Sequence, residues 1–350
     1  MIKIPKELGY YMPAEWEKHS AVWLAWPYGD ITFPNILNEI EQSYCQIIKA
    51  IEDSEKVKLI VLNESEKERI SKMFIVYGIK LDNITFYTIP DYADVWVRDY
   101  APITLFNKKN TKLAFVKWNY NAYGKEDDPS FVDLLKDDKV FSNILNESNH
   151  EIFKPEIILE GGAIESNGKG TLLTTEQCLL NKNRNSELDR SRTEIYLKAY
   201  LGIENIIWLK DGLINDHTDG HIDEIARFVN PNTIVCAYEK NKKDSNYVIL
   251  VDNYKTLKKS RDENGKKFKV IKLPMPHMNY DNGEKAPVSY TNFYIGNSVI
   301  LMSIFNDPND KKAMKIIKSL FKKHKVIGID CSKIIYGGGA IHCITMQDYI

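Results

Sequence analysis

The sequence has few cysteines, and their spacing indicates neither cross-linking nor a zinc ribbon. The 350 residues include five, at Cys45, Cys178, Cys236, Cys331 and Cys343, and no two of them form a C-x-x-C pair. Cysteines this far apart in a chain of this length exclude a small disulfide framework. We therefore expect reduced thiols and a cytoplasmic location.

Long apolar runs and a large net charge are also missing. No run is long enough to cross a bilayer, and the segment Met1–Glu7 lacks the apolar core of a signal peptide. The 47 basic and 48 acidic residues give a net charge of −1, so no overall field favours an anionic partner. We expect no nucleic-acid partner and no membrane partner.

The apolar content is high enough for a substantial core. With 43% hydrophobic residues, the chain is long enough for one large domain or two smaller ones. Because no segment resembles an interdomain linker, we expect one domain over residues 1–350. Apolar periodicity predicts alternating helices and short buried strands. The expected helices cover residues 36–51, 66–77, 187–201, 247–260 and 310–324, and the expected strands cover 21–27, 58–62, 84–90, 156–160, 205–209, 269–274 and 325–330.

Polar residues recur at nearly constant intervals along this alternation. Asp99, Glu160, His221, Tyr290 and Cys343 are separated by 61, 61, 69 and 53 residues. A constant period of mixed α/β units is typical of repeated blades around an axis, each too small to bury its own face. An open α/β sheet is the alternative, because it alternates strands and helices as well.

His221 and Asp223 form a candidate acid–base pair. On a strand, residues two apart share a face, so both side chains would point the same way. A histidine beside a carboxylate can transfer protons near neutral pH, although such pairs are also often structural. A metal site at His217 and His221 would need a helix, and Thr218-Asp219-Gly220 is a poor helix sequence.

Two further carboxylates end apolar runs. Asp99 closes the run from Val95, and Glu160 closes an expected strand just before Gly161-Gly162. A carboxylate at the end of a buried strand is costly unless it is paired or faces a site that favours negative charge. Each could instead be a salt-bridged turn at the surface.

Cys343 follows three consecutive glycines, Gly337–Gly339, and we expect it on a short strand. Taken alone, a buried structural cysteine is the more common situation. Together with one histidine and three acids at the repeat period, a thiol nucleophile becomes the better interpretation. The combination suggests covalent attack on a cationic carbon held by carboxylates.

The whole chain resembles the agmatine deiminases of the guanidine-modifying superfamily. Seven motifs in order carry the resemblance: Met12–Trp16, Trp96–Asp99, Leu159–Gly162, Leu173–Asn185, Asp219–Asp223, Tyr290–Tyr294 and Gly337–Cys343. The resemblance implies a pentein fold, a five-bladed pseudo-symmetric α/β propeller with repeats of about sixty residues. It further implies hydrolysis of agmatine to N-carbamoylputrescine and ammonia, in the synthesis of the polyamine putrescine from arginine.

The resemblance also implies residue roles. Cys343 would be the nucleophile and His221 the general acid and base, oriented by Glu160. Asp99 and Asp223 would hold the guanidinium group, while Trp96 and Asp219 would complete the substrate contacts. Neither a metal nor a cofactor is implied. The partner is a small cationic guanidine substrate, and a homodimer is an allowed assembly.

The chain departs from the family pattern at Tyr123, where tryptophan is frequent, and at Ala340 and Glu224, where asparagine is frequent. These departures concern contacts with the tail of the substrate. A peptidylarginine or arginine deiminase with the same chemistry is the alternative function, and Arg227 would be its candidate clamp for a carboxylate. An amidinotransferase and a non-catalytic binding protein are the more distant alternatives.

Overall fold

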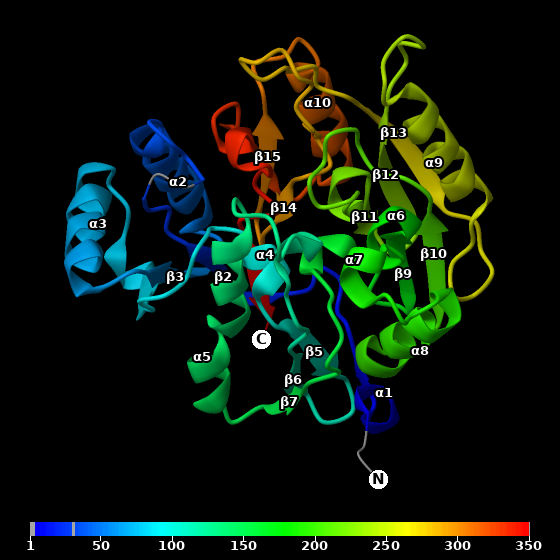
Figure 1. Ribbon diagram of the computed structural model, residues 1–350, viewed down its shortest axis with the longest axis horizontal. Coiled ribbons are helices and arrows are strands. Elements are labelled where there is room, and N and C mark those ends of the chain that lie inside the picture. Colours follow the sequence, from blue (N-terminus) through cyan, green and yellow to red (C-terminus); the bar gives the residue numbers. More distant parts are fainter. Residues whose placement is uncertain (1–3, 30–31, 350) are drawn as a thin grey trace. The chain divides into compact units, whose positions relative to one another are not determined.

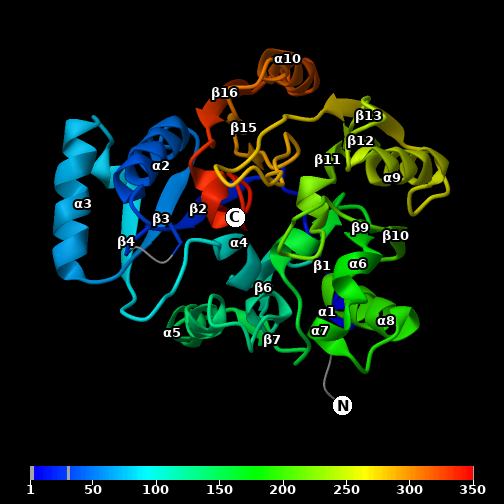
Figure 2. The same ribbon diagram turned by 45° about the horizontal axis from the view of Figure 1, so that its top comes forward.

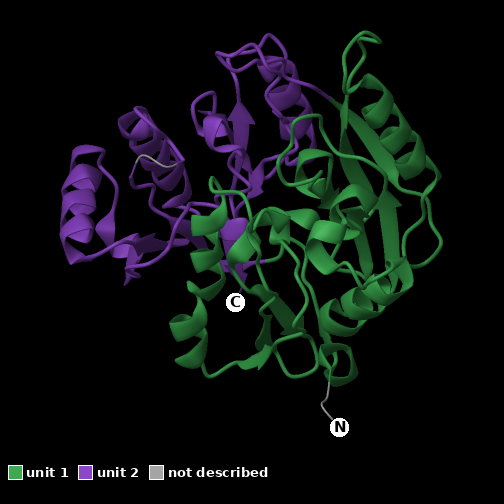
Figure 3. Cartoon of the chain, viewed as in Figure 1, with its two compact units in different colours: residues 1–17, 99–273 green, residues 18–98, 274–350 purple. Residues whose placement is uncertain are grey.

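The computed structural model describes residues 4–29 and 32–349 (Figure 1). The chain divides into two compact units, coloured separately in Figure 3. Unit 1 contains residues 1–17 and 99–273, and unit 2 contains residues 18–98 and 274–350. Among the described helices, none is long and apolar enough to cross a membrane.

Unit 1 contains three small sheets in its described residues. The first has the strand order β1-β5-β6-β7, the second β10-β9-β8 and the third β11-β12-β13. Their strands are β1 (Tyr10–Tyr11), β5 (Ile103–Asn107), β6 (Lys112–Val116), β7 (Glu151–Phe153), β8 (Glu165–Ser166), β9 (Thr171–Thr175), β10 (Asn205–Leu209), β11 (Ala226–Asn230), β12 (Thr233–Tyr238) and β13 (Lys269–Pro274).

Unit 2 contains two small sheets in its described residues, with the strand orders β14-β15-β16 and β17-β2-β3-β4. The second sheet joins strands from both ends of the sequence, because Trp23 of β2 pairs with Met346 of β17. The strands are β2 (His19–Ala25), β3 (Lys56–Val61), β4 (Ile84–Thr88), β14 (Tyr294–Ile295), β15 (Val299–Ile304), β16 (Lys325–Asp330) and β17 (Met346–Tyr349).

The sheets share one plan. An antiparallel pair comes first, as in β5–β6, β8–β9, β14–β15 and β17–β2. A helix then leads to a strand that pairs parallel with the second member, as in β9–β10, β15–β16 and β2–β3. The five described sheets match the five predicted repeats, and the predicted mixed α/β class is confirmed.

Two of the long connecting helices, α3 and α8, begin at residues whose side chains cap them. In α8, the side chain of Asp189 accepts a hydrogen bond from the backbone of Arg192, and Gly202 ends the helix with φ of 66°. In α3, Asn63 caps the backbone of Glu66 in the same way. Figure 2 shows α3 beside the strands β3 and β4 of its own sheet, and α8 next to α1.

Most helices are short, and several of the shortest carry candidate site residues. The helices are α1 (Pro5–Leu8), α2 (Leu37–Ile51), α3 (Glu64–Val76), α4 (Val97–Tyr100), α5 (Ser142–Asn146), α6 (Glu176–Leu179), α7 (Lys182–Asn185), α8 (Arg190–Leu201), α9 (Tyr247–Lys259) and α10 (Asp310–Leu320). The 3₁₀ turns are η1 (Leu81–Asn83), η2 (Ala122–Gly124), η3 (Val132–Lys139), η4 (Gly161–Ala163), η5 (Ile222–Glu224) and η6 (Ile334–Gly337).

The expected strands around the polar positions were wrong. Residues 156–160 form only a bridge between Ile158 and Asn119, and the segment after His221 is the 3₁₀ turn η5. Cys343 lies in a turn that precedes β17. The recurring polar residues therefore sit in the turns leading into the first strand of each sheet, where the backbone can bend enough to aim a side chain.

Candidate active site

In unit 1, a constrained turn positions His221. Asp219 and Gly220 have φ values of 64° and 89°, in the left-handed region that glycine adopts easily. A Cβ on Gly220 would lie 2.8 Å from the backbone of Gly212, so no larger residue fits there. The hydroxyl of Thr175 donates to the carbonyl of Gly220 at 2.7 Å and ties this turn to β9.

The His221 side chain is buried beside negative charge. It is 1% exposed, and its Nδ1 lies 3.7 Å from Oδ1 of Asp99. Burial alone would lower the pKa of His221. The neighbouring side chains of Asp99, Cys178 and Glu160 raise it instead, and the net result is a pKa well above the usual value. The imidazole therefore favours the protonated form near neutral pH.

Asp99 lies in α4 and is held at both oxygens. Its Oδ1 accepts a hydrogen bond from the backbone of Gly162 at 2.9 Å, and its Oδ2 accepts one from the hydroxyl of Tyr123 at 2.9 Å. Burial, opposed by the charge of His221, raises the pKa of Asp99 to about 6. This carboxyl is thus ionised at neutral pH and loses its charge in mild acid.

Gly162 allows these groups to approach one another. A Cβ at this position would lie 2.6 Å from Nδ1 of His221 and 2.8 Å from Oδ1 of Asp99. Both distances are shorter than a Cβ tolerates, so only glycine leaves the histidine and the carboxylate in place. This steric requirement explains why the Gly161-Gly162 motif has glycine at position 162.

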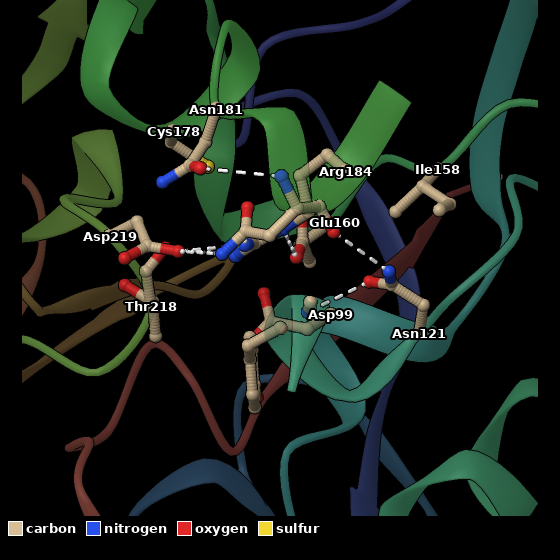
Figure 4. Close-up of polar contacts among 12 residues, drawn as sticks. Asp99, Asn121, Ile158, Glu160, Cys178, Asn181, Arg184, Thr218 and Asp219 are labelled. Carbon is tan, nitrogen blue, oxygen red and sulfur yellow. Dashed lines mark hydrogen bonds and ion pairs between the residues drawn. The ribbon is translucent and has the colours of Figure 1, made fainter. Parts of the chain in front are cut away.

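Glu160 pairs with an arginine inside unit 1. Nε of Arg184, in α7, donates to Oε1 of Glu160 at 2.5 Å, and both side chains are fully buried. Figure 4 shows the guanidinium of Arg184 reaching both Glu160 and Asp219. A buried charge needs a partner, and the guanidinium of Arg184 supplies one for the carboxylate of Glu160.

Arg184 also binds the turn that precedes His221. Its Nη1 donates to Oδ2 of Asp219 at 2.8 Å, and its Nη2 donates to the carbonyl of Thr218 at 3.0 Å. One guanidinium therefore links the Glu160 segment to the His221 turn. The contact of Asp219 with substrate stays a prediction. Arg184 already binds Oδ2 of Asp219, so the substrate would have to share this carboxylate with Arg184.

Asp223 and Glu224 are buried in η5. They are 0% and 5% exposed, and the pKa of Glu224 is raised well above its usual value by burial and then by the charges of Asp223 and Asp216. The carboxyl group of Glu224 therefore favours the neutral form.

His217 takes no part in a two-histidine site on a helix. Residues 214–220 form turns, as the poor helix sequence predicts. The ring of His217 packs against Tyr123 and Phe131 at centroid distances of 5.2 and 5.7 Å. Burial lowers the pKa of His217 to about 4, so it is neutral near pH 7.

In unit 2, Cys343 is fixed within a hydrogen-bonded turn. Nδ2 of Asn292 donates to Sγ of Cys343 at 3.1 Å, and Oδ1 of Asn292 accepts from the backbone of His342 at 2.9 Å. The backbone of Arg98 donates to the carbonyl of Cys343 at 3.2 Å. The thiol is 7% exposed, in contrast to the four other cysteines, which are completely buried.

Trp96 packs over the glycine bend in the same unit. A Cβ on Gly337 or on Gly339 would lie 2.8 or 2.7 Å from the indole ring, so both positions require glycine. Nε1 of Trp96 donates to Oδ2 of Asp94 at 2.8 Å, which fixes the ring. Tyr290 is the fourth polar residue of the repeat. Its hydroxyl donates to Oδ1 of Asp310 at 2.5 Å, so its contact holds the fold together and is not part of the candidate site.

Sequence reasoning assigned no individual role to three residues that the structure places at these sites: Cys178, Arg184 and Asn292. Each lies within a stretch that the sequence analysis singled out, so the signal was present at the level of the motif. What the sequence did not show is that each side chain contacts, or lies within 4.8 Å of, a predicted site residue.

The two units supply complementary chemistry. Unit 1 provides a protonated histidine beside buried carboxylates, an arrangement that binds a delocalised cation and moves a proton. Unit 2 provides a slightly exposed thiol that accepts an amide hydrogen bond, the group needed for covalent attack.

Comparisons with known proteins agree with this chemistry. The family model of the Porphyromonas-type peptidyl-arginine deiminases matches residues 11–348. A Legionella pneumophila (strain Paris) protein provisionally named agmatine deiminase is 38% identical over 98% of this chain and 96% of its own length. The agmatine deiminase of Stutzerimonas stutzeri is 34% identical over 98% of this chain and 96% of its own length.

A solved structure has the same fold. The agmatine deiminase of Enterococcus faecalis superposes with a TM-score of 0.89 at 28% sequence identity, covering 100% of this chain and 98% of that one. Full coverage of both chains means that the similarity extends to all five sheets and to the turns that carry the polar residues.

Proposed function

Since this chain belongs to the family of Porphyromonas-type peptidyl-arginine deiminases, and its similar relatives include agmatine deiminases, we propose that it hydrolyses agmatine to N-carbamoylputrescine and ammonia. The observation that carries this proposal is the buried imidazole of His221, whose Nδ1 lies 3.7 Å from Oδ1 of the buried Asp99. We place the reaction in the synthesis of putrescine from arginine and in the cytoplasm, where the five thiols stay reduced.

The proposed reaction begins with attack by the thiolate of Cys343 on the guanidinium carbon. A C–S bond forms, the C–N bond breaks, and the departing ammonia takes a proton from His221. The resulting amidino-thioether is then attacked by water, whose proton returns to His221. Breaking the C–S bond releases the ureido product and regenerates the thiolate.

The carboxylates hold the substrate for this attack. Asp99 and Asp223 pair with the guanidinium nitrogens in fork-like contacts that a neutral amide cannot replace. Glu160, fixed by Arg184, orients His221, and Trp96 closes the site. None of these roles needs a metal or a cofactor.

The proposal favours agmatine over arginine because Arg227 and Arg184, in the described part of unit 1, are already paired with carboxylates and so are poor clamps for an α-carboxylate. Arg227, the arginine considered for that role, is 0% exposed and binds Glu15 at 2.7 Å and Glu165 at 2.8 Å. Arg184 is equally engaged. A carboxylate buried without a cationic partner costs several kcal/mol.

We expect kcat/KM for agmatine to exceed that for free arginine at least about 100-fold. Ammonia release from equal concentrations of the two substrates measures this ratio directly. A peptide ending in arginine serves as the third substrate. Similar values for agmatine and arginine, or a preference for the peptide, would assign the chain to the alternative deiminase class.

The pH dependence of kcat/KM should report the ionisation of Asp99. Because its pKa is about 6 and the guanidinium needs the charged form, kcat/KM is expected to fall about tenfold per pH unit below pH 6. The hydroxyl of Tyr123 donates to this carboxylate and so stabilises its charged form.

The variant Tyr123→Phe removes that single hydrogen bond. We expect the acidic limb of its profile to move to higher pH, with a loss of kcat/KM that is large at pH 6 and small at pH 8. A limb at the same pH in both proteins would mean that a different group controls the acidic side. An equal loss at every pH would indicate a purely structural role for the hydroxyl.

A further inference from the structure

Three buried side chains of unit 1 place a sulfur, an imidazole nitrogen and a carboxylate oxygen together. One such atom from each of Glu160, Cys178 and His221 lies within 4.8 Å of the other two. These are the three ligand types that zinc prefers in proteins. Ligand atoms around tetrahedral zinc are roughly 3.5 Å apart, so small side-chain rotations would bring all three onto one ion.

Rigid local structure brings these residues together. The side chain of Thr175 caps α6 by accepting a hydrogen bond from the backbone of Cys178. Glu160 immediately precedes η4, and His221 immediately precedes η5. Each side chain is therefore presented from the end of a fixed turn or helix, as a preorganised metal site requires.

Several polar atoms of this cluster have no hydrogen-bond partner in the described part of the chain. Oε2 of Glu160 and both ring nitrogens of His221 are buried and accept or donate no hydrogen bond among the described residues. A buried polar atom without a partner destabilises the folded protein, so a ligand that binds it is favoured. Cys178 is 0% exposed, and the proposed reaction does not use it.

The surroundings of the cluster resemble the outer shell of a zinc site. Asp99 lies 3.7 Å from Nδ1 of His221, and Arg184 binds the other oxygen of Glu160. Carboxylates beside metal-bound histidines and donors to metal-bound carboxylates are the usual orienting groups. The negative charge of Asp223 favours a divalent cation here, while Arg184 opposes it.

We propose that Glu160, Cys178 and His221 bind one zinc ion, and that this ion inhibits the enzyme. Zinc binding displaces two protons to solvent, the thiol proton of Cys178 and one ring proton of the protonated His221, because the ligands are a thiolate and a neutral imidazole. A zinc-bound imidazole no longer exchanges protons near neutral pH, so His221 could neither protonate ammonia nor activate water. The inhibition rests on the proposed function, whereas the binding does not.

Cobalt(II) titration of the chelator-treated, full-length protein tests the binding. Cobalt replaces zinc at such sites, and a thiolate ligand adds a sulfur-to-cobalt charge-transfer band. We expect the band at one equivalent in the wild type and in Cys343→Ala, and its loss in Cys178→Ala. A band lost in Cys343→Ala and kept in Cys178→Ala would place the metal on the other thiol, and no band in any protein would refute the site.

Zinc inhibition of agmatine hydrolysis tests the consequence, with each variant measured against its own rate in chelator. Cys178→Ala should need at least about tenfold more zinc for half inhibition than the wild type. The control Cys236→Ala removes another completely buried thiol and should match the wild type. Equal sensitivity of all three proteins would refute inhibition through this site. A protein without agmatine turnover would contradict the proposed function, while the cobalt titration would still test the metal site.

Discussion

Replacing Cys343 by alanine is expected to lower kcat for agmatine by at least about 10⁴-fold, because the substitution removes the nucleophile that forms the covalent intermediate. The fold should survive. The substitution removes one sulfur from a turn whose backbone contacts, such as the hydrogen bond from Arg98, do not depend on the side chain. Steady-state ammonia release gives kcat, and circular dichroism confirms folding.

The matched control is Cys236→Ala. Cys236 is completely buried in β12, and the hydrogen bond of its thiol goes to the backbone of the next residue. We expect this variant to keep close to full activity. Turnover that survives in Cys343→Ala but disappears in Cys236→Ala would overturn the assignment of the nucleophile. A trapped thioether adduct detected by mass spectrometry on Cys343 would identify the attacked atom independently.

Replacing Arg184 by methionine is expected to cost about 3–5 kcal/mol in the free energy of unfolding. The substitution leaves Glu160 fully buried without its cation and releases Asp219 and the turn before His221. In the protein that remains folded, kcat should fall by about 10²-fold, because a small displacement of the acid–base pair misaligns it with the substrate. Urea unfolding and steady-state kinetics measure the two effects.

Arg190→Met is the matched control for this prediction. Arg190 also pairs with a glutamate, Glu176, but its side chain is 46% exposed. An exposed pair contributes about 1 kcal/mol or less, so both stability and kcat should stay near the wild-type values. Adding Glu160→Gln to Arg184→Met should recover part of the lost stability, since it removes the unpaired charge. Equal losses for Arg184→Met and Arg190→Met would contradict a special role for the buried guanidinium.

Regular elements could be predicted from the sequence because local periodicity determines them. The pattern over residues 36–51 predicted a helix, and α2 covers Leu37–Ile51. The strand expected at 205–209 is β10 with the same bounds. The regular spacing of the polar residues predicted the five repeats for a related reason. Each repeat places a polar turn at the same point, just before its first strand.

The detail of the candidate site depends on tertiary contacts that leave no local pattern. Strand alternation suggested that His221 and Asp223 share a face, but contact between Gly212 and Gly220 forces a tight turn there. Arg184 is a polar residue in a four-residue helix, and nothing in its neighbourhood signals burial. Only the structure shows that Arg184 forms a buried ion pair with Glu160.

The pairing of β17 with β2 has a consequence for biosynthesis. One side of β2 lacks its partner strand until the ribosome has made Met346–Tyr349, although β2 itself is synthesised near the start. Long-range strand pairing of this kind slows folding and leaves an edge open to association with other nascent chains. Because Cys343 directly precedes β17, every shorter translation product that ends before it lacks the nucleophile. We therefore expect truncated chains to depend on chaperones and to be inert as deiminases.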